Sequence, residues 1–246
     1  MIAHGTDTLA YTASLLFWFF PDPPVPVVLA ASLDAREAAS DLRRAIMLAS
    51  EEPAGIYVVV GEKTLSCLNL KFERVERDGF TNWNLAEPLY RGRLSPPDLP
   101  CLSDRAKLTS LIEQAINQVF ILKVFPGMRG DYLIALMNSG IRYFILELYD
   151  TGTVNLRESP YSLKKAFVEG KERGVLFFCT SQQEGIVDFS EYITSHELWR
   201  EGAIPMGALT TESTFTRLIL ALLVSEDEEE VLKLMEEVNE DANFRY

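Results

Sequence analysis

The sequence has 246 residues, with 23 Lys and Arg against 36 Asp and Glu, so its formal net charge at pH 7 is −13. An acidic surface repels phosphate backbones, and we therefore expect no direct nucleic-acid partner. The hydrophobic fraction of 48% is ordinary for a globular protein, and the length suits one large domain or two smaller ones.

The three cysteines, Cys67, Cys101 and Cys179, are far apart and odd in number. This usage fits a reducing compartment better than a disulfide framework. The two histidines, His4 and His196, have no local spacing that supports a zinc site, so we expect no metal and no other cofactor.

The apolar stretch from Leu9 to Phe20 is too short to span a bilayer. No cationic region precedes it, which argues against a signal peptide. We therefore expect a cytoplasmic protein without a membrane partner.

Hydrophobic patterning predicts alternating strands and helices in the first part of the chain. The expected elements are a strand ending near His4, a helix over Thr8–Phe20, a buried strand over Val25–Ala31, a helix over Arg36–Ser50 and a buried strand over Gly55–Gly61. On the second helix, the residues expected to share the buried face are Leu42, Ala45, Ile46 and Ala49. This order argues for a parallel α/β sheet.

The segment from Asp78 to Leu102 is rich in Pro, Gly and Asn, which predicts an irregular connection. Ser103–Gln118 is either a short linking helix or a further part of the connector.

The alternation of strands and helices then restarts. Expected strands are Val119–Val124, Tyr143–Tyr149 and Val175–Thr180, and expected helices are Asp131–Ser139, Ser162–Arg173, Thr194–Glu201, Thr211–Leu223 and Glu226–Val238. A capping box of Ser225 and Glu228 is expected to open the last helix. The pattern predicts an α/β protein with domains over 1–100 and 119–246 and a connector over 101–118.

A short loop, His4-Gly5-Thr6-Asp7-Thr8, follows the first strand and precedes the first helix. Ligands of parallel sheets bind at this edge. A hydroxyl beside a carboxylate there could bind or activate a polar substrate. The simpler alternative is that Thr6 and Asp7 cap the helix that begins near Thr8, and these five residues alone favour capping.

Longer matches change that balance. The matching segments are His4-Gly5-Thr6-Asp7-Thr8-Leu9-Ala10-Tyr11-Thr12-Ala13, Pro26-Val27-Val28-Leu29, Asp41-Leu42-Arg43-Arg44-Ala45, Phe80-Thr81-Asn82-Trp83-Asn84, Glu87-Pro88-Leu89, Phe125-Pro126-Gly127 and Thr210-Thr211-Glu212-Ser213. Each is short, but in order and spacing together they resemble the type I L-asparaginase (asparaginase/glutaminase) family.

The resemblance implies a two-domain α/β fold, with an N-terminal parallel or mixed sheet covered by helices and a smaller flavodoxin-like C-terminal domain. It also implies hydrolysis of the side-chain amide of asparagine to aspartate and ammonia. Family members activate a threonine hydroxyl with a buried lysine whose pKa is lowered by burial.

Carried over by position, the catalytic pair is Thr6 with Lys71, and Asp7 binds the α-ammonium group of the substrate. Lys71 aligns with the family's catalytic lysine only if this chain lacks one residue before it. Lys63 is the competing choice, and a solvated lysine at a strand edge is the alternative for Lys71.

Several departures from the family pattern bear on activity. The Gly-Gly-Thr nucleophile loop and the Asp-Ser-Ser segment that binds the substrate carboxylate would lie upstream of His4, so we expect an incomplete N-terminal domain. A late start or fragment, a degenerate non-catalytic relative, and a missing segment supplied by another polypeptide are the three explanations. The loop Tyr149–Thr153 lacks an asparagine common in the family, and the loop through Ser32, Asp34 and Arg36 is shortened, which affects substrate specificity.

Two classes of function follow. The first is an amidohydrolase acting on a small amino-acid amide, with the glutaminase subunit of a tRNA-dependent amidotransferase as a variant. The second is a catalytically inactive protein that binds an amino acid. Because family active sites form between subunits, the resemblance also implies a homodimer or homotetramer.

Overall fold

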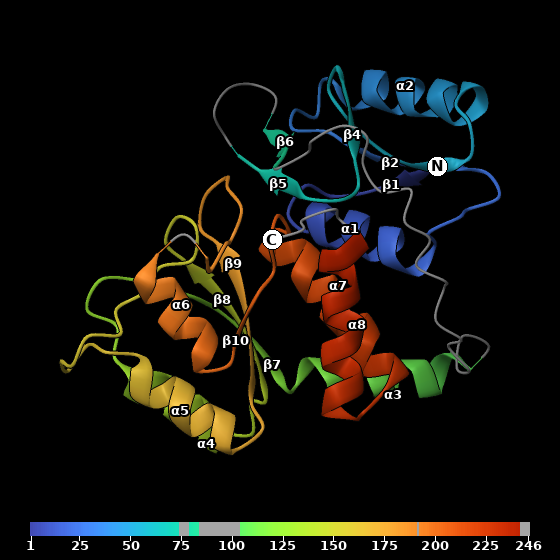
Figure 1. Cartoon of the computed structure of the whole chain (residues 1–246). Coiled ribbons are helices and arrows are strands. Elements are labelled where there is room, and N and C mark those ends of the chain that lie inside the picture. Colours follow the sequence, from blue (N-terminus) through green and yellow to red (C-terminus); the bar gives the residue numbers. More distant parts are fainter. Residues whose placement is uncertain (74–78, 84–103, 191, 242–246) are drawn as a thin grey trace. The chain divides into compact units, whose positions relative to one another are not determined.

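The computed structural model describes residues 1–73, 79–83, 104–190 and 192–241. The chain divides into two compact units, Met1–Asp98 and Leu99–Tyr246 (Figure 1). Both are α/β, with a mixed sheet in the first unit and a parallel sheet in the second, which confirms the predicted fold class. Among the described residues, no helix is long and apolar enough to cross a membrane.

The first unit is built on a four-stranded sheet in the order β1-β2-β3-β4. Its strands are β1 (Ile2–Ala3), β2 (Pro26–Ala31), β3 (Gly55–Val60) and β4 (Lys63–Ser66). The first three run parallel, and β4 returns antiparallel to β3 through a turn in which Gly61 has φ 57°. Central strands of such a sheet are buried on both faces, which explains the continuous apolar runs of β2 and β3.

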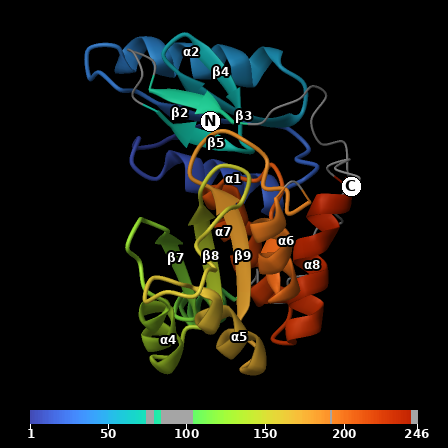
Figure 2. The same ribbon diagram turned by 60° about the vertical axis from the view of Figure 1, so that its left-hand side comes forward.

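Helices α1 (Leu9–Phe19) and α2 (Ala38–Glu51) cover opposite faces of this sheet (Figure 2). Under α1, Leu9 and Ala13 pack with Leu29 and Val58. Under α2 lies a smaller cluster of Val28, Ala30, Ala45 and Val59. The predicted helices and strands of this region are confirmed.

The predicted buried face of α2 is partly wrong. Leu42 and Ile46 are 37% and 53% exposed. Ala45 is buried and Ala49 packs against the sheet, as predicted, but Asp41 and Leu48 take the places expected of Leu42 and Ile46. The buried positions follow the spacing i, i+4, i+7, so the contact stripe is centred one residue earlier than the sequence predicts.

Two short strands, β5 (Leu70–Phe72) and β6 (Phe80–Asn82), form a separate antiparallel pair. The prediction of irregular structure from Asp78 is therefore wrong for β6, while Asn84–Leu102 lies outside the described residues. The Asn82 side chain holds the pair in place by donating to the carbonyls of Ser66 and Leu68, at 2.9 and 3.0 Å, and accepting from the Ser66 amide.

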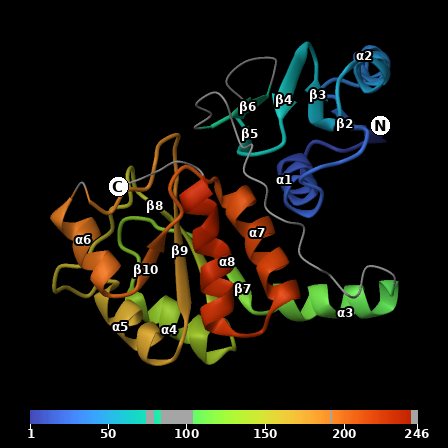
Figure 3. The same cartoon turned by 45° about the vertical axis from the view of Figure 1, so that its right-hand side comes forward.

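The second unit has a parallel sheet in the order β10-β9-β8-β7. Its strands are β7 (Val119–Lys123), β8 (Tyr143–Leu148), β9 (Leu176–Ser181) and β10 (Ala203–Pro205), of which β10 was not predicted. Helices α4 (Gly130–Asn138), α5 (Lys164–Glu172) and α6 (Ile193–Arg200) cover one face. On the other face lies α7 (Thr211–Val224), and α3 (Arg105–Ile116) and α8 (Glu228–Asp241) pack against α7 (Figure 3). The predicted connector over 101–118 stays a prediction.

The predicted cap of the last helix is wrong by two residues. The side chain of Asp227, not Ser225, accepts the hydrogen bond from the Glu230 amide, at 3.0 Å. Ser225 instead accepts from the Asp227 amide at 3.1 Å, and Glu228 pairs with Arg142. A cap needs an acceptor three residues before the amide it satisfies, and Asp227 meets that spacing.

Two cysteines of the described chain, Cys67 and Cys179, are buried free thiols. Burial raises the pKa of the Cys67 thiol to about 12, and the thiol donates a hydrogen bond to the Ile56 carbonyl at 3.0 Å. These cysteines therefore behave as small apolar core residues. Cys101 lies outside the described residues.

An aromatic cluster centres the core of the second unit. The Phe177 ring stacks on Phe144 at a centroid distance of 5.4 Å and contacts Phe167 at 4.7 Å. A Cβ atom on Gly170 of α5 would lie 2.5 Å from two carbons of the Phe177 ring. The absence of a side chain at Gly170 thus permits the close approach of α5 to β9.

The variant Gly170→Ala tests this packing. Alanine favours a helix by about 1 kcal/mol over glycine, whereas overpacking a rigid core costs about 1–3 kcal/mol. The Phe177 ring is 1% exposed and held by two other rings, so the clash dominates. We expect a free energy of unfolding lower by about 1–2 kcal/mol in urea titrations.

Glu172→Ala, at an exposed position of the same helix, is the control and should change stability by less than about 0.5 kcal/mol. A Gly170→Ala protein more stable than the parent would show that the ring yields.

Candidate active site

The carboxyl edge of the first unit's sheet gathers three loops. Strands β1, β2 and β3 are parallel and in register, with Ala3 beside Ala30 and Ala30 beside Val59. The loop after β1, the loop after β2 and the turn after β3 therefore leave from the same edge. Edges of this kind hold the ligand sites of open α/β sheets.

Thr6 and Asp7 lie in the loop after β1. Thr6 is half-buried and Asp7 is exposed. The N-cap of α1 is Thr8, which makes no side-chain capping hydrogen bond, while the Thr6 carbonyl accepts from the Leu9 amide at 3.4 Å. Helix α1 thus begins on the backbone of this loop, and the Thr6 hydroxyl and the Asp7 carboxylate are not needed for its N-cap.

His4 fixes the start of the same loop. Its Nδ1 lies 2.6 Å from the Gly5 carbonyl, and its Nε2 lies 2.9 Å from the Thr12 hydroxyl. A carbonyl only accepts, so Nδ1 donates to it, and in the neutral ring Nε2 accepts from Thr12. The ring ties the loop to the first turn of α1. Sequence reasoning missed this contact, although a polar Thr12 inside an apolar helix was a signal for it.

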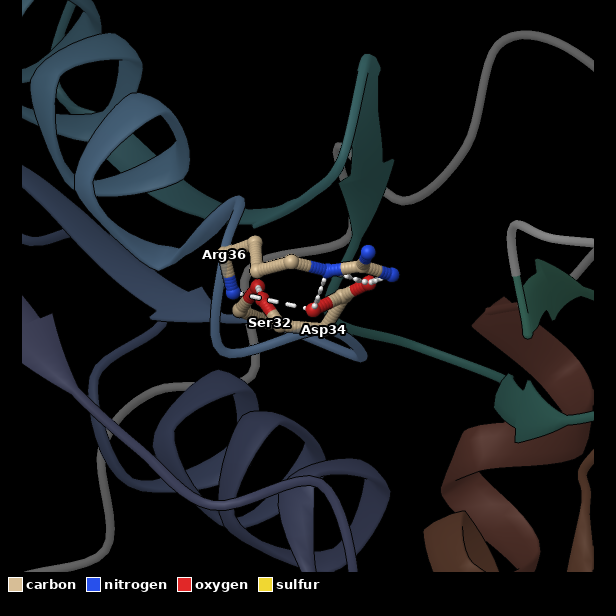
Figure 4. A network of polar contacts seen from close by, with 3 residues as sticks. All are labelled: Ser32, Asp34 and Arg36. Carbon is tan, nitrogen blue, oxygen red and sulfur yellow. Dashed lines mark hydrogen bonds and ion pairs between the residues drawn. The ribbon is translucent and has the colours of Figure 1, made fainter.

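The loop after β2 is closed on itself (Figure 4). The Arg36 guanidinium contacts the Asp34 carboxylate at 2.5 Å, the Arg36 amide donates to it at 2.9 Å, and the Ser32 hydroxyl donates to the Asp34 carbonyl at 2.8 Å. The Arg36 side chain lowers the pKa of Asp34. The negative charge of Asp34 is thus neutralised by Arg36 of its own loop. Asp7 lies in the neighbouring loop, after β1.

Lys71 lies on β5, paired with Thr81 of β6. It is half-buried, and its amine lies 5.0 Å from the centre of the Trp83 ring. The Trp83 indole N–H donates to Glu73 at 2.7 Å, which orients the ring. Contact with an aromatic face stabilises a charged ammonium group.

The β5–β6 pair, which carries Lys71, packs against the same hydrophobic core as the carboxyl edge of the main sheet. Leu70 of β5 and Phe80 of β6 belong to the cluster that contains Leu9 of α1 and Val60 of β3. The competing Lys63 begins β4, and its amine lies 3.5 Å from the Phe80 carbonyl. The structure thus puts Thr6 and Asp7 on one loop, Lys63 on β4 of the main sheet and Lys71 on β5 of the two-stranded sheet of the same unit. Asn84 and Glu87–Leu89 of the matched segments lie outside the described residues.

The second unit carries a polar chain at the carboxyl edge of its own sheet. The Thr211 hydroxyl donates to the Glu147 carboxylate at 2.7 Å and lies 2.9 Å from the Thr180 hydroxyl. Because the one hydroxyl proton of Thr211 goes to Glu147, Thr180 is the donor in the second bond. These bonds join β8, β9 and the start of α7. Sequence reasoning missed Glu147, although a carboxylate within an apolar strand signalled it.

The loop after β8, Tyr149–Thr153, holds a strained residue and buried hydroxyls. Asp150 has φ 42°, which is unusual for a residue with a side chain. The hydroxyls of Tyr149 and Thr151 are buried without a hydrogen-bond partner in the described part of the chain. In the same part, no group of three His, Cys, Asp or Glu residues could hold a metal ion.

Comparison with known proteins identifies both units. Residues 1–91 match the family described as "Asparaginase, N-terminal", and residues 118–235 match "Glutaminase/Asparaginase C-terminal domain". A glutamyl-tRNA(Gln) amidotransferase subunit of Metallosphaera sedula is 33% identical over 96% of this chain and 56% of its own. The L-asparaginase of Thermococcus kodakarensis is 28% identical over 96% of this chain and 73% of its own. The chain thus spans about half the length of the amidotransferase subunits it matches.

Solved structures agree with this assignment. The thermostable L-asparaginase from T. kodakarensis superposes with a TM-score of 0.74 over 96% of this chain and 73% of that chain, at 28% identity. L-asparaginase I from Vibrio cholerae shares the fold, with a TM-score of 0.73 over 96% of this chain and 73% of its own, at 21% identity. The chain therefore belongs to the type I L-asparaginase (asparaginase/glutaminase) family.

Proposed function

We propose that this chain is an amidohydrolase that converts L-asparagine to aspartate and ammonia. The observation that carries the proposal is the Thr6–Asp7 loop at the carboxyl edge of β1, in a chain of this family. Thr6 and Asp7 are consecutive residues, and α1 does not need the side chain of either for its N-cap. The ligand is a small amino-acid amide, and the assembly is a homodimer or homotetramer.

The proposed roles follow from the chemistry of each group. Thr6 and Lys71 handle the proton: the Thr6 hydroxyl passes its proton to the Lys71 amine and takes up the proton of the attacking hydroxyl, which the resemblance places in the Gly-Gly-Thr loop and not at Thr6. Asp7 pairs with the α-ammonium group of the substrate through a charge-assisted hydrogen bond. This bond fixes one end of the substrate and so positions its side-chain amide in the site. A general base accepts a proton only in its neutral form, and contact with an aromatic face stabilises a charged ammonium group. The proposal therefore requires the Lys71 amine to move off the Trp83 ring before it accepts the proton.

Replacing Thr6 with valine removes the hydroxyl at nearly constant shape. The Leu9 amide bonds the backbone of residue 6, so the loop should persist. We expect kcat for ammonia release from asparagine to fall by at least about 100-fold. Thr8→Val, an exposed neighbour in the same loop, is the control and should keep most of the activity. Equal losses in the two variants would refute a special role for Thr6.

Replacing each lysine with methionine separates the two candidate bases. Methionine keeps the apolar stem and removes the amine. If Lys71 is the base, Lys71→Met should lower kcat by about 100-fold or more, while Lys63→Met should stay within about threefold of the parent. Melting temperatures of both variants control for folding. The reverse ranking would transfer the role to Lys63.

A second candidate is the ammonia-releasing subunit of a tRNA-dependent amidotransferase. It is favoured by the 33% identity to the M. sedula subunit, against 28% to the T. kodakarensis asparaginase. The same assay with glutamine distinguishes the two, because the second candidate predicts a higher kcat/KM for glutamine than for asparagine. Thermal stabilisation by asparagine without ammonia release would instead identify an inactive amino-acid-binding protein.

A further inference from the structure

Helix α6 of the second unit carries large side chains on the side that its own unit does not bury. It packs beside β10, the end strand of the described sheet, and its buried residues are Ser195 and Leu198 (Figure 3). By contrast, Ile193 is 90% exposed, Trp199 is 58% exposed, and Tyr192 at the N-cap is 48% exposed. Tyr192 and Trp199 are seven residues apart, or about two helical turns, and so lie on one side. Exposed aromatic and aliphatic side chains that gather in this way mark an interaction surface.

This surface, the α6 face, consists of Tyr192, Ile193, His196, Trp199 and Arg200. Two hollows open on it, and His196 lines both of them. The first has a volume of about 300 Å³ and Trp199 in its wall. The second has a volume of about 420 Å³ and is lined by Tyr192, Ile193 and Arg200. The His196 ring meets the Trp199 ring edge-on at 5.6 Å, and this contact orients the indole.

The charges around the α6 face nearly cancel, unlike those of the whole chain. Among the described residues that line the two hollows, Asp188 and Glu197 are negative and Arg200 is positive. The amine of Lys164 on α5 pairs with Glu197 at 2.6 Å and lies 3.9 Å from Glu201. Two copies of a chain with a net charge of −13 repel each other over most of their surface. They can approach with least repulsion at a face whose local charge is close to zero.

The α6 face is complementary to itself when two helices run antiparallel. With a two-fold axis at His196, residues at equal distances before and after it face each other. Ile193, three residues before, then faces Trp199, three residues after. Tyr192, four residues before, faces Arg200, four residues after, which suits a contact between an aromatic ring and a guanidinium group. Each hollow thus receives the side chain that lines the other hollow, a match that an unrelated partner would not require.

We propose that α6 joins two copies of this chain in a two-fold helix pair centred on His196. Trp199 of each copy enters the hollow beside Ile193 of the other, and Arg200 of each copy lies on the Tyr192 ring of the other. Tryptophan, tyrosine and arginine are the residues that contribute most to binding at protein interfaces. The pair gives a contact surface to the assembly proposed above, and it rests on that assembly and not on the proposed chemistry.

Complementary charges test this pairing in the full chain. Two separate proteins are made, Ile193→Glu and Trp199→Lys, and their masses are followed by light scattering over a range of concentrations. The parent should associate with a dissociation constant of about 1 μM or lower. Each variant alone should associate at least about tenfold more weakly, because a lone charge enters an apolar hollow. An equimolar mixture should recover association, since the new carboxylate of one protein faces the new amine of the other and the second contact stays apolar.

Tyr132→Glu is the matched control, because Tyr132 is 50% exposed on α4 of the same unit, and it should associate like the parent. Unchanged melting temperatures would establish that all three variants are folded. A monomeric parent, variants that associate like the parent, or a mixture no tighter than either variant alone would overturn the proposal. The mass does not depend on turnover, so an active monomer contradicts the helix pair alone, and an inactive dimer contradicts the proposed activity alone.

Discussion

The parallel register of β1, β2 and β3 is the constraint on which the candidate site depends. It brings Ala3, Ala30 and Val59 level with one another, so the loops after all three strands leave from one edge. A slip of one residue would turn every side chain of a strand to the other face of the sheet. The separate clusters under α1 and α2 prevent that slip, because each contains side chains of one face.

The same register explains how a polar loop is held at the end of an apolar sheet. His4 bonds β2 through its backbone and bonds Gly5 and Thr12 through its ring. Both ends of the Thr6–Asp7 segment are therefore anchored, one in the sheet and one in α1. Positioning by rigid elements is what a site needs in order to orient a substrate without large movements.

In the second unit, the hydrogen bonds of Glu147 and Thr180 to Thr211 tie the start of α7 to the sheet, as the His4 ring ties the start of α1 to its loop. A half-buried carboxylate and two buried hydroxyls are hydrogen-bonded to one another, and they join two strands to the start of a helix. Such a network costs free energy when one member is removed, so it fixes the helix position relative to the sheet.

Long elements were predictable from the sequence because their periodicity is strong. Strands β2 and β3 are continuous apolar runs, α1 is an apolar run that ends before Pro21, and α7 begins after Thr210, whose side chain accepts from the Ser213 amide. Strands β5 and β6 have three residues each, too few to show alternation, and the side chain of Asn82 determines their pairing. The face of α2 was misjudged because Leu42 and Ile46 are apolar yet exposed.

The site was predictable in part. Thr6 and Asp7 were singled out by their place after a strand, whereas the contacts of His4 with Thr12 and of Lys71 with Trp83 link residues that no local pattern connects. Tertiary contacts of this kind depend on how the elements pack. They join residues at no regular spacing in the sequence, so a single sequence does not predict them.

Asparagine binding to the Asp7→Asn variant tests the central claim most directly. Calorimetry would compare L-asparagine with succinamic acid, which lacks the α-amino group. If Asp7 pairs with that ammonium group, the variant should lose about tenfold to 100-fold in affinity for asparagine and keep its affinity for succinamic acid. Equal losses for both ligands, or no loss for asparagine, would contradict the assignment of this loop as the substrate site.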